Sequence, residues 1–312
     1  MPAPAPIFLA GPTAVGKSAV ALTLAEKMGG EIISVDSMQV YRGLDIGTAK
    51  PSADERARVP HHLLDVCDLT AAFDAAQFIR LAQNAVAESQ ARNKTPIFCG
   101  GTGLYFKAFL AGLGEAPPAD AELRAELEAV PLGELLHELR ALDPAAYEKI
   151  DRQNPRRVVR AVEVIRLTGK KFSEQRAEWK SVEPKAQSPK SKVIFCFTRP
   201  PEDLHRRINV RVDEMFARGL VDETCGLLQR GLAENKFALQ AIGYRQVVEH
   251  LRGEHDLAET IALVKIRTRQ FAKRQLTWFR RQGNCEWIEL RPDEAAAETV
   301  ARIEWDNGAK GA

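Results

Sequence analysis

The sequence predicts an α/β fold: a parallel sheet core whose chain is interrupted by a helical insertion domain. In the first third, short apolar runs bounded by Gly, Pro or Asp alternate with helical stretches, which is the pattern of strand–helix–strand units. After Gly112 the chain becomes rich in Leu, Glu and Arg with helical spacing. An apolar run returns at Val193–Phe197, which we interpret as a strand that rejoins the sheet.

The elements of the core follow in order. Buried parallel strands read as brief, continuous apolar runs, and the first part of the chain has three of them: Ile7–Ala10, Ile32–Val35 and Ile97–Cys99. Helices are expected between them at Lys17–Met28 and Phe73–Arg92. Beyond residue 200 the chain is mostly helical, with expected helices at Leu204–Arg218, Asp222–Arg230 and Ala258–Arg281, then a strand at Glu286–Leu290 and a charged terminal helix.

The insertion is expected to span residues 115–190, which leaves 1–114 and 191–312 as the core. Its helical periodicity rests on Leu123, Leu127, Leu135, Leu136 and Leu139. A helix is expected from Pro155 to Thr168 because Gly169 supplies a stop signal. Ser181–Lys192 lacks apolar residues and is interpreted as a loop.

Composition is that of an ordinary soluble globular protein, with 312 residues, 45% hydrophobic and 28% charged. The net charge of +2 argues against a globally basic nucleic-acid binder, so local clusters matter more. No run approaches the roughly 20 apolar residues of a membrane span, and no signal peptide is visible. Five scattered cysteines without a CxxC pair indicate reduced thiols rather than a disulfide frame or zinc site. We therefore expect a cytoplasmic protein, and nothing demands more than a monomer.

The strongest local motif fits GxxxxGK[ST] and lies between a predicted strand and a predicted helix. It comprises Gly11, Pro12, Thr13, Ala14, Val15, Gly16, Lys17 and Ser18. Such a phosphate-binding loop (P-loop) directs backbone N–H groups and a lysine at phosphate oxygens, while the hydroxyl can ligate magnesium. The motif makes the expected core P-loop NTPase-like and identifies a diphosphate-like group rather than ATP as such.

Two further loops follow strand ends, where parallel sheets place their ligands. Asp36 and Ser37 follow the second strand, and this carboxylate is equally suited to act as a general base, a magnesium ligand or a helix cap. Thr102 lies among three glycines, in Gly100-Gly101-Thr102-Gly103, after the third strand. Its hydroxyl is placed either to cap the next helix or to contact substrate, and the glycines permit close backbone approach to a ligand.

Two basic clusters point to polyanions. Between Lys265 and Arg281 there are seven basic residues and no acidic one, which favours phosphate contact over a solvated face. Val264, Phe271, Trp278 and Phe279 form the apolar side of this expected helix. A second cluster, Arg156, Arg157 and Arg160, opens the helix after Asn154; RNA contacts and ion pairs within the acidic insertion fit it about equally. His61 and His62 lack partners for a metal site, so we assign them a structural role.

Taken in order, these motifs resemble the tRNA dimethylallyltransferase (tRNA isopentenyltransferase) family. The resemblance rests on GPTAVGKS, ISVDSMQVYRGLDIGTAKP, HHLLD, GGTGLY, NPRRVVRAVEV, AIGYRQ and TRQFAKRQLTWFRR, which together span residues 7 to about 281. Val15 stands where the family often has a small polar residue, and Met38 varies too; neither position carries identified chemistry.

The resemblance implies a reaction and a division of labour. A dimethylallyl group would pass from dimethylallyl diphosphate to N6 of the adenosine immediately 3′ of the anticodon (adenosine-37), in tRNAs reading codons that begin with U. Asp36 would be the general base, Thr102 would position the amine or the bridging oxygen, and the adenosine would be flipped out of its loop. The P-loop with Mg²⁺ on Ser18 would hold the diphosphate, joined by Arg160 and Arg207.

The resemblance also implies an RNA-binding set. The insertion would contact the anticodon stem-loop, and the implied tRNA contacts are Asp36, Ser37, Met38, Gln39, Thr102, Arg156, Arg157, Arg160, Gly243, Tyr244, Arg245, Lys273, Arg274, Gln275, Trp278 and Arg280.

Two rival functions remain. A P-loop small-molecule kinase would use the same loop to bind ATP, but it has no need of the acid-free basic helix. A non-catalytic tRNA-binding protein would leave the P-loop and the adjoining acid–base residue unexplained.

Overall fold

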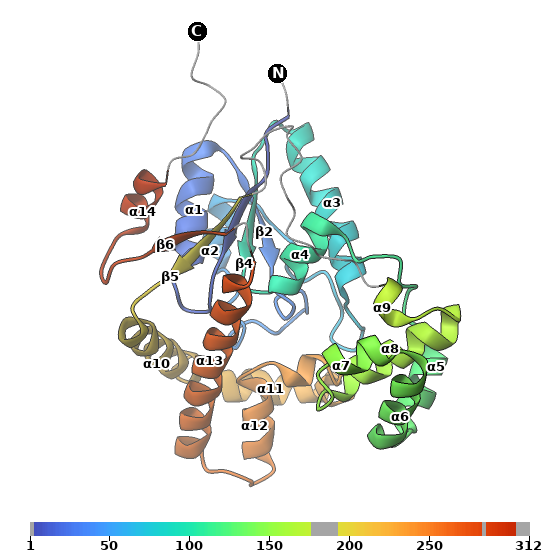
Figure 1. The fold of residues 1–312 in the computed structure, drawn as a ribbon. Coiled ribbons are helices and arrows are strands. Elements are labelled where there is room, and N and C mark those ends of the chain that lie inside the picture. The colour runs from blue at the N-terminus through green and yellow to red at the C-terminus, as the bar shows by residue number, and fades with distance from the viewer. Residues whose placement is uncertain (1–2, 176–192, 283–284, 304–312) are drawn as a thin grey trace. The chain divides into compact units, whose positions relative to one another are not determined.

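The core is a six-stranded, all-parallel sheet in the order β3–β2–β4–β1–β5–β6 (Figure 1). The structure is a computed structural model that describes residues 3–175, 193–282 and 285–303. The strands are β1 (Ile7–Ala10), β2 (Glu31–Val35), β3 (His61–His62), β4 (Pro96–Gly100), β5 (Ile194–Thr198) and β6 (Cys285–Glu289). The five strands expected from apolar runs are confirmed to within a residue or two. The two-residue β3 is too short to produce a pattern.

Alternate side chains of the strands face two different helical layers. Leu9, Ile97 and Phe197 pack in one cluster with residues of α1 (Lys17–Met28), α10 (Pro201–Ala217) and α14 (Ala296–Arg302). Phe8 and Phe98 pack in the other cluster with residues of α3 (Ala75–Ala91) and α4 (Gly103–Ala111). Figure 1 shows α1 and α14 on one side of the sheet and α3 and α4 on the other. Both faces are covered, which explains why the central strands β1 and β4 are continuous apolar runs.

A third cluster of buried residues lies in the chain after β2. Val40, Tyr41 and Leu44 pack with Leu227 and Tyr244, which belong to α11 (Leu220–Gln229) and α12 (Tyr244–Leu251). Gly47 lies so close to the Tyr244 ring that a Cβ there would come within 2.5 Å of it. The DIGTAKP and AIGYRQ segments are therefore packed together although they lie about two hundred residues apart.

The longest helix, α13 (Leu257–Arg280), begins at a capping box in which Asp256 and Glu259 each accept from the other's backbone N–H. Its buried positions are Thr260, Val264, Ala272, Gln275 and Phe279. Phe271 was expected on this apolar side, but it is exposed because it lies at the edge of the buried face. Its ring is covered instead by the guanidinium of Arg274, with Cζ 5.8 Å from the ring centroid. A short helix, α2 (Ala53–Arg58), lies between β2 and β3 in the chain.

The chain divides into two compact units, Met1–Leu110 with Ser181–Ala312, and Ala111–Lys180. The second unit consists of short helices around its own core of Leu127, Leu135, Leu139 and Val162. They are α5 (Ala121–Ala129), α6 (Leu132–Leu142), α7 (Pro144–Lys149), α8 (Pro155–Thr168) and α9 (Phe172–Gln175). The sequence places the domain boundaries at 114/115 and 190/191; the latter, like the expected loop at Ser181–Lys192, lies outside the described residues. Within the described part of the chain, no helix is long and apolar enough to cross a membrane.

Candidate active site

Three loops gather at one edge of the sheet because they leave three adjacent strands at the same level. In the register, Ala10 and Val35 both align with Gly100, so β1, β2 and β4 end side by side. The P-loop follows β1, Asp36 follows β2, and the turn with Thr102 follows β4. The expected site residues Lys17, Asp36 and Thr102 are thereby brought together.

The P-loop adopts a conformation that requires positive φ angles at several positions. Gly11 and Gly16 have φ of 151° and 109°, and Ala14 has 62°. α1 starts directly after Gly16. Lys17 donates from Nζ to the Pro12 carbonyl oxygen at 3.1 Å, and the Ser18 side chain is exposed at the first turn of α1. The loop thus presents a helix N-terminus, an ammonium group and a hydroxyl to one region, as anion binding requires.

Three arginines, from α10 and the segment before it, form hydrogen bonds with the P-loop. Arg199 is buried and donates from Nε to the Val15 carbonyl at 2.7 Å. Arg207 donates from Nε to the Ala14 carbonyl at 3.0 Å, and Arg211 lies 3.4 Å from the Thr13 hydroxyl. Each contact fixes the loop by its carbonyl or hydroxyl groups. Arg199 is also held by Asp203 and the Arg291 carbonyl, whereas Arg207 and Arg211 line a cavity and keep further guanidinium N–H groups for a ligand.

A cavity of about 400 Å³ opens between the P-loop and α10. Its lining includes Lys17, Ser18, Arg206, Arg207 and Arg211. Burial lowers the pKa of Lys17, and the nearby Arg211 lowers it further, while the Asp36 carboxylate opposes the shift. Burial also lowers the pKa of Arg211 and Arg207. These cations lie close together and are partly desolvated, so the charge of a bound polyanion such as diphosphate would stabilise them.

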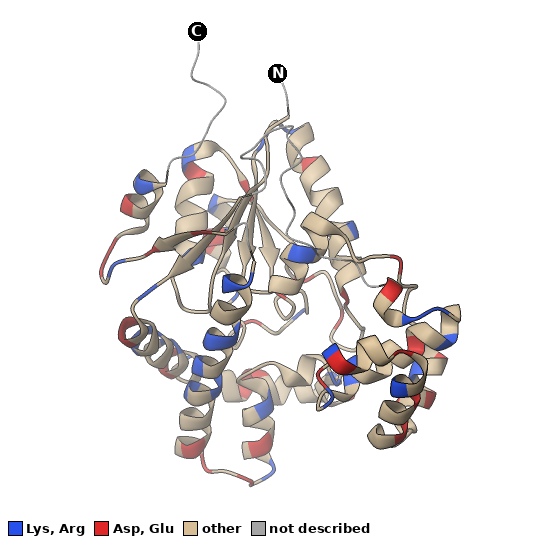
Figure 2. Ribbon diagram, in the orientation of Figure 1, with Lys and Arg blue, Asp and Glu red and all other residues tan. Residues whose placement is uncertain are grey.

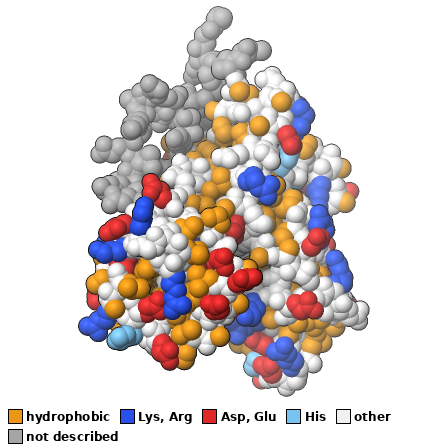
Figure 3. Space-filling view, turned by 90° about the vertical axis from the view of Figure 1, so that its right-hand side faces the viewer, with side chains coloured by type: hydrophobic (Ala, Val, Ile, Leu, Met, Phe, Trp, Pro, Cys, Tyr) orange, Lys and Arg blue, Asp and Glu red, His pale blue; other side chains and the backbone are white. Residues whose placement is uncertain are grey.

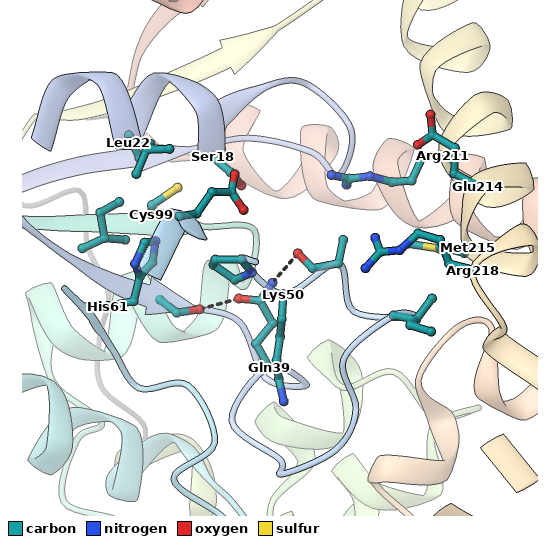
Figure 4. A pocket seen from close by; sticks show the side chains of 17 residues that line it. Ser18, Leu22, Gln39, Lys50, His61, Cys99, Arg211, Glu214, Met215 and Arg218 are labelled. Carbon is teal, nitrogen blue, oxygen red and sulfur yellow. Dashed lines mark hydrogen bonds between the residues drawn. The ribbon is translucent and has the colours of Figure 1, made fainter. Parts of the chain in front are cut away.

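A second cavity, of about 230 Å³, lies on the other side of Ser18 (Figure 4). Leu22, Cys99 and His61 line one end, and Arg211, Glu214 and Arg218 line the other. It shares four lining residues with the first cavity: Ser18, Glu55, Arg211 and Glu214. Burial raises the pKa of the Cys99 thiol to about 11, so the thiol stays protonated near neutrality.

Asp36 makes the turn that follows β2. Its Oδ1 accepts from the backbone N–H of Met38 at 2.8 Å and of Gln39 at 3.3 Å. Within the described residues no hydrogen bond reaches Oδ2 from the protein. The capping interpretation and the general-base interpretation are therefore compatible: one oxygen shapes the turn and the other is available to a substrate proton.

The residues that follow Asp36 stabilise its loop through hydrogen bonds and packing. Gln39 donates from Nε2 to the Thr48 carbonyl at 3.0 Å, and its Oε1 accepts from Ser34 at 2.8 Å. Ser37 donates its backbone N–H to the Thr102 hydroxyl oxygen. Met38 is half-buried against the cluster that contains Val40 and Tyr41. In this structure Gln39 and Met38 shape the loop that carries Asp36.

The glycines around Thr102 serve close packing within the protein. A Cβ at Gly100 would lie 2.1 Å from the Val35 carbonyl oxygen, and one at Gly103 would lie 2.2 Å from the Trp278 ring. The sequence prediction attributed these glycines to close approach of a ligand. In the structure the close neighbours are a strand and α13, and the close approach of a ligand stays a prediction.

The predicted RNA contacts on α13 differ in exposure. Lys273, Arg274 and Arg280 are exposed, and Figure 2 shows the basic residues concentrated along this helix. Lys265 instead forms an ion pair with Asp213 at 2.6 Å. Trp278 is half-buried against the cluster that contains Phe279. Gln275 is buried between two loops of the site.

The Gly243–Arg245 segment is also mostly internal. Tyr244 is fully buried, and its hydroxyl donates to Glu223 at 2.6 Å and accepts from the Gly47 N–H at 3.0 Å. Burial raises the pKa of this phenol. Arg245 is exposed and pairs with Glu249. In this structure Tyr244 therefore acts as a structural link, and Arg245 is the member of this segment at the surface.

The predicted arginines of the insertion lie in the second unit, on α8. Arg156 and Arg157 are exposed. Arg160 donates to the Glu163 carboxylate at 2.6 Å and to the Pro117 carbonyl. Glu163 has no exposed side-chain surface and is also paired with Arg124. Ion pairing inside the insertion thus accounts for Arg160 within its own unit, and its role toward diphosphate stays a prediction.

Sequence reasoning missed Arg199 and Arg211. Arg207 and Arg211 are spaced i, i+4, which places both on one face of α10, next to the face of the buried Ile208 and Val212. That spacing was the signal available for Arg211. Arg199 follows β5 and has no comparable pattern.

The two histidines have structural partners, as expected. His62 Nε2 lies 2.8 Å from Glu31, and His61 Nδ1 lies 2.7 Å from the Val59 carbonyl. No cluster of three potential metal ligands of the His, Cys, Asp and Glu types occurs in residues 3–175, 193–282 and 285–303. One face of the molecule, shown in Figure 3, carries acidic, basic and apolar side chains intermixed and presents no continuous basic surface.

The comparisons with known proteins agree with one family. The family model for IPP transferase matches residues 39–282. The tRNA dimethylallyltransferase 1 of Trichlorobacter lovleyi is 45% identical over 302 residues, which cover 96% of this chain and 98% of that protein. The tRNA dimethylallyltransferase of Halorhodospira halophila is 47% identical, with 93% of this chain and 94% of that protein covered.

Solved structures show the same relationship. The tRNA isopentenylpyrophosphate transferase of Bacillus halodurans is 40% identical, with a TM-score of 0.68 over 95% of this chain and 93% of that one. A eukaryotic dimethylallyltransferase acting on tRNA is 28% identical, with a TM-score of 0.73 over 94% of this chain and 76% of that one. The resemblance and the P-loop NTPase-like α/β fold predicted from the sequence are confirmed: this chain belongs to the IPP transferase family.

Proposed function

We propose that this protein transfers the dimethylallyl group of dimethylallyl diphosphate to N6 of adenosine-37 in tRNAs that read codons beginning with U. Its relatives are named tRNA dimethylallyltransferases and are similar over nearly the whole chain. The observation that carries the proposal is the convergence of the P-loop, Asp36 and Thr102 at three adjacent strand ends. This arrangement sets an anion site beside a proton acceptor, as the transfer of an allyl group to an amine requires.

The reaction balances with the groups at this edge. The N6 lone pair forms a bond to C1 of the allyl group while the bond from C1 to the bridging oxygen breaks. Diphosphate leaves with that electron pair, and the N6 proton passes to Asp36. An exocyclic adenine amine is weakly nucleophilic because its lone pair is delocalised into the ring, so removing the proton as the bond forms lowers the barrier.

The departing diphosphate gains charge in the transition state. Lys17, Arg207 and Arg211 line the cavity that would receive it, together with P-loop N–H groups. Fixed donors of this kind stabilise the developing charge more than they stabilise bound substrate, which accelerates the chemical step.

Magnesium fits the residues present. The exposed Ser18 hydroxyl lies at the border of both cavities, and Mg²⁺ commonly takes few protein ligands and completes its shell with phosphate oxygens and water. Bound there with Ser18, it would supply positive charge to the diphosphate. ATP binding by the same loop is a further expectation of the motif alone.

We assign RNA binding to the exposed basic residues of α13, to Arg245 and to the arginines of the helical insertion. Sequence-specific readers of RNA usually engage splayed loop bases through stacking and edge hydrogen bonds, and the anticodon loop offers such bases. We further propose that the protein works in the cytoplasm as a monomer.

The direct test is to incubate the protein with magnesium, radiolabelled dimethylallyl diphosphate and unmodified tRNA that reads codons beginning with U. Label on the adenosine beside the anticodon, over multiple turnovers, is the expected result. A matched tRNA with guanosine at that position should take up none.

Absence of label with folded protein and several such tRNAs would contradict the proposal. An ATP-consumption screen against small metabolites would then test the kinase alternative, and tRNA binding without turnover would support a binding protein.

A further inference from the structure

Gln275 lies at the point where α13 meets two loops of the candidate site. Its Oε1 accepts from the backbone N–H of Thr13 at 2.9 Å, and its Nε2 donates to the Gly101 carbonyl at 3.0 Å. The residue is only 7% exposed. One amide therefore joins the P-loop after β1 to the turn after β4, across 262 and 174 residues of sequence.

The turn after β4 packs closely against the Gln275 amide. A Cβ at Gly101 would lie 2.1 Å from Nε2 of Gln275 and 3.2 Å from the Gly11 carbonyl oxygen. One turn further along α13, Trp278 packs on Gly103. Helix α13 thus packs directly against the turn that carries Thr102.

The two loops joined by Gln275 serve different steps of the proposed reaction: departure of the leaving group and transfer of the proton. The P-loop faces the leaving group, while Thr102 accepts from the Ser37 N–H and so connects to the turn of Asp36. Hydrogen bonds join Thr13 to Gln275, Gln275 to Gly101, and Thr102 to Ser37. Gly101 and Thr102 are consecutive residues, so the backbone completes the connection. The distance between the leaving group and the proton acceptor depends on this connection.

An apolar side chain would fill the same volume without orienting either loop. The amide is specific because one end accepts and the other donates, so it matches one N–H and one carbonyl. Misplacement of reacting groups by about 1 Å can lower a rate about 100-fold.

We infer that Gln275 is a positioning residue that fixes the P-loop relative to Asp36 and Thr102, and that it transmits occupancy of one loop to the other. This inference rests on the proposed function for its catalytic consequence. It assigns Gln275 a role inside the protein instead of the tRNA contact expected from the sequence.

The first test compares Gln275→Met with Gln275→Glu. In Gln275→Met we expect kcat to fall about 10- to 100-fold while KM for dimethylallyl diphosphate changes less than about threefold. The control is Gln282→Met, which lies just after the end of α13 and whose amide donates to the Trp278 carbonyl and, among the described residues, to neither loop of the site; it should match wild type. A kcat within twofold of wild type in Gln275→Met would overturn the inference.

Gln275→Glu provides a readout that loss of packing would not give. The introduced carboxyl, when protonated, has the same donor and acceptor as the amide; when ionised it has acceptors only and faces the Gly101 carbonyl. The ratio of its kcat to that of wild type should therefore fall as pH rises, since the ratio cancels any pH dependence that the two enzymes share. The ratio for Gln275→Met should be flat. A flat ratio for both variants contradicts positioning through this amide.

A third measurement needs no variant and no turnover. Pyrophosphate should slow amide hydrogen exchange in Gly11–Ser18 and also at the Ser37 N–H, because the connection through Gln275 joins them. Protection confined to the P-loop would overturn the transmission. Protection that reaches Ser37 in a protein that transfers no label would leave the connection intact and contradict the proposed function instead.

Discussion

The Ser37 backbone N–H donates to the Thr102 hydroxyl oxygen at 3.2 Å and so joins the loops that follow β2 and β4. Thr102 also donates its own N–H to the Val35 carbonyl at 3.2 Å. In the described residues the hydroxyl proton of Thr102 has no acceptor. The hydroxyl is therefore fixed in place by the protein while its proton is available to a substrate oxygen or nitrogen.

Thr102→Val should lower kcat about 10- to 100-fold, because the isosteric change removes both the acceptor for Ser37 and the donor for substrate. Thr102→Ser keeps the hydroxyl and should stay within a few-fold of wild type. Steady-state transfer of label to tRNA measures both. Equal activity of the Val and Ser variants would contradict a role for the hydroxyl.

Asp36→Asn should slow transfer strongly and leave tRNA binding intact. The asparagine oxygen can still accept from Met38 and Gln39, so the turn is kept, but the side chain no longer accepts a proton. We expect a fall of about 100- to 10,000-fold in single-turnover rate. The affinity of Asp36→Asn for an anticodon stem-loop, measured by filter binding, should change little. Asp36→Ala should show the same loss of transfer and the same affinity for RNA, but its turn should be less ordered. Unchanged turnover would refute the general-base role.

Lys17 should give diphosphate binding a pH dependence below the usual range of lysine. Burial and Arg211 lower its pKa in the folded protein, so the ammonium loses its proton at lower pH than an exposed lysine, and affinity for pyrophosphate should decline as pH rises through that value. Calorimetric titrations across neutral to alkaline pH measure this. Lys17→Ala should bind more weakly and lose the dependence; a dependence that persists in the variant would assign it to another group.

Arg211→Met should raise KM for dimethylallyl diphosphate and lower kcat. The guanidinium lines the cavity beside the P-loop, so its loss removes charge that stabilises both bound substrate and leaving group. Because Arg211 lowers the pKa of Lys17, the same variant should shift the pH dependence of pyrophosphate binding upward. Arg252→Met, at an exposed position after α12, is the control. Identical kinetics in both variants would exclude Arg211 from the site.

The sequence predicts five of the six strands and the three loops of the candidate site because these depend on local patterns. Continuous apolar runs mark strands buried on two faces, and glycines mark the strand-to-helix turns at Gly11 and Gly101. Adjacent parallel strands end at one edge, so Asp36 and Thr102 were placed together without knowing any distance.

The contacts that orient those loops were not predictable because they join segments far apart in sequence. The resemblance implies a tRNA contact for Gln275, and the burial of this residue follows only from the packing of α13 on Gly101 and Gly103. Likewise Tyr244 is internal because Gly47 and Glu223 meet its hydroxyl. Periodicity along one helix cannot identify such partners.

Glu31 should make the stability of the first unit depend on acid pH. The carboxylate is 3% exposed and accepts from Arg92 at 2.7 and 3.0 Å, from Ser89 at 2.7 Å and from His62 at 2.8 Å. The hydrogen bond from Arg92, against the opposing effect of burial, lowers its pKa from 4.5 to about 2. Because the folded-state pKa is depressed, the stabilisation is complete above about 4.5 and is lost as pH falls toward 2; the difference corresponds to about 3 kcal/mol.

Glu31→Gln should therefore lower the urea midpoint of unfolding at pH 7, and this deficit should shrink as the pH is lowered from 4.5 to 2.5. The reason is that wild type loses the stabilising charge over that range while the neutral amide has none to lose. Glu26→Gln is a matched control, because Glu26 pairs with Arg58 at a more exposed position and should lower the midpoint little at any pH. A deficit in Glu31→Gln that stays constant with pH would mean that lost packing or geometry, and not the ionised carboxylate, accounts for it.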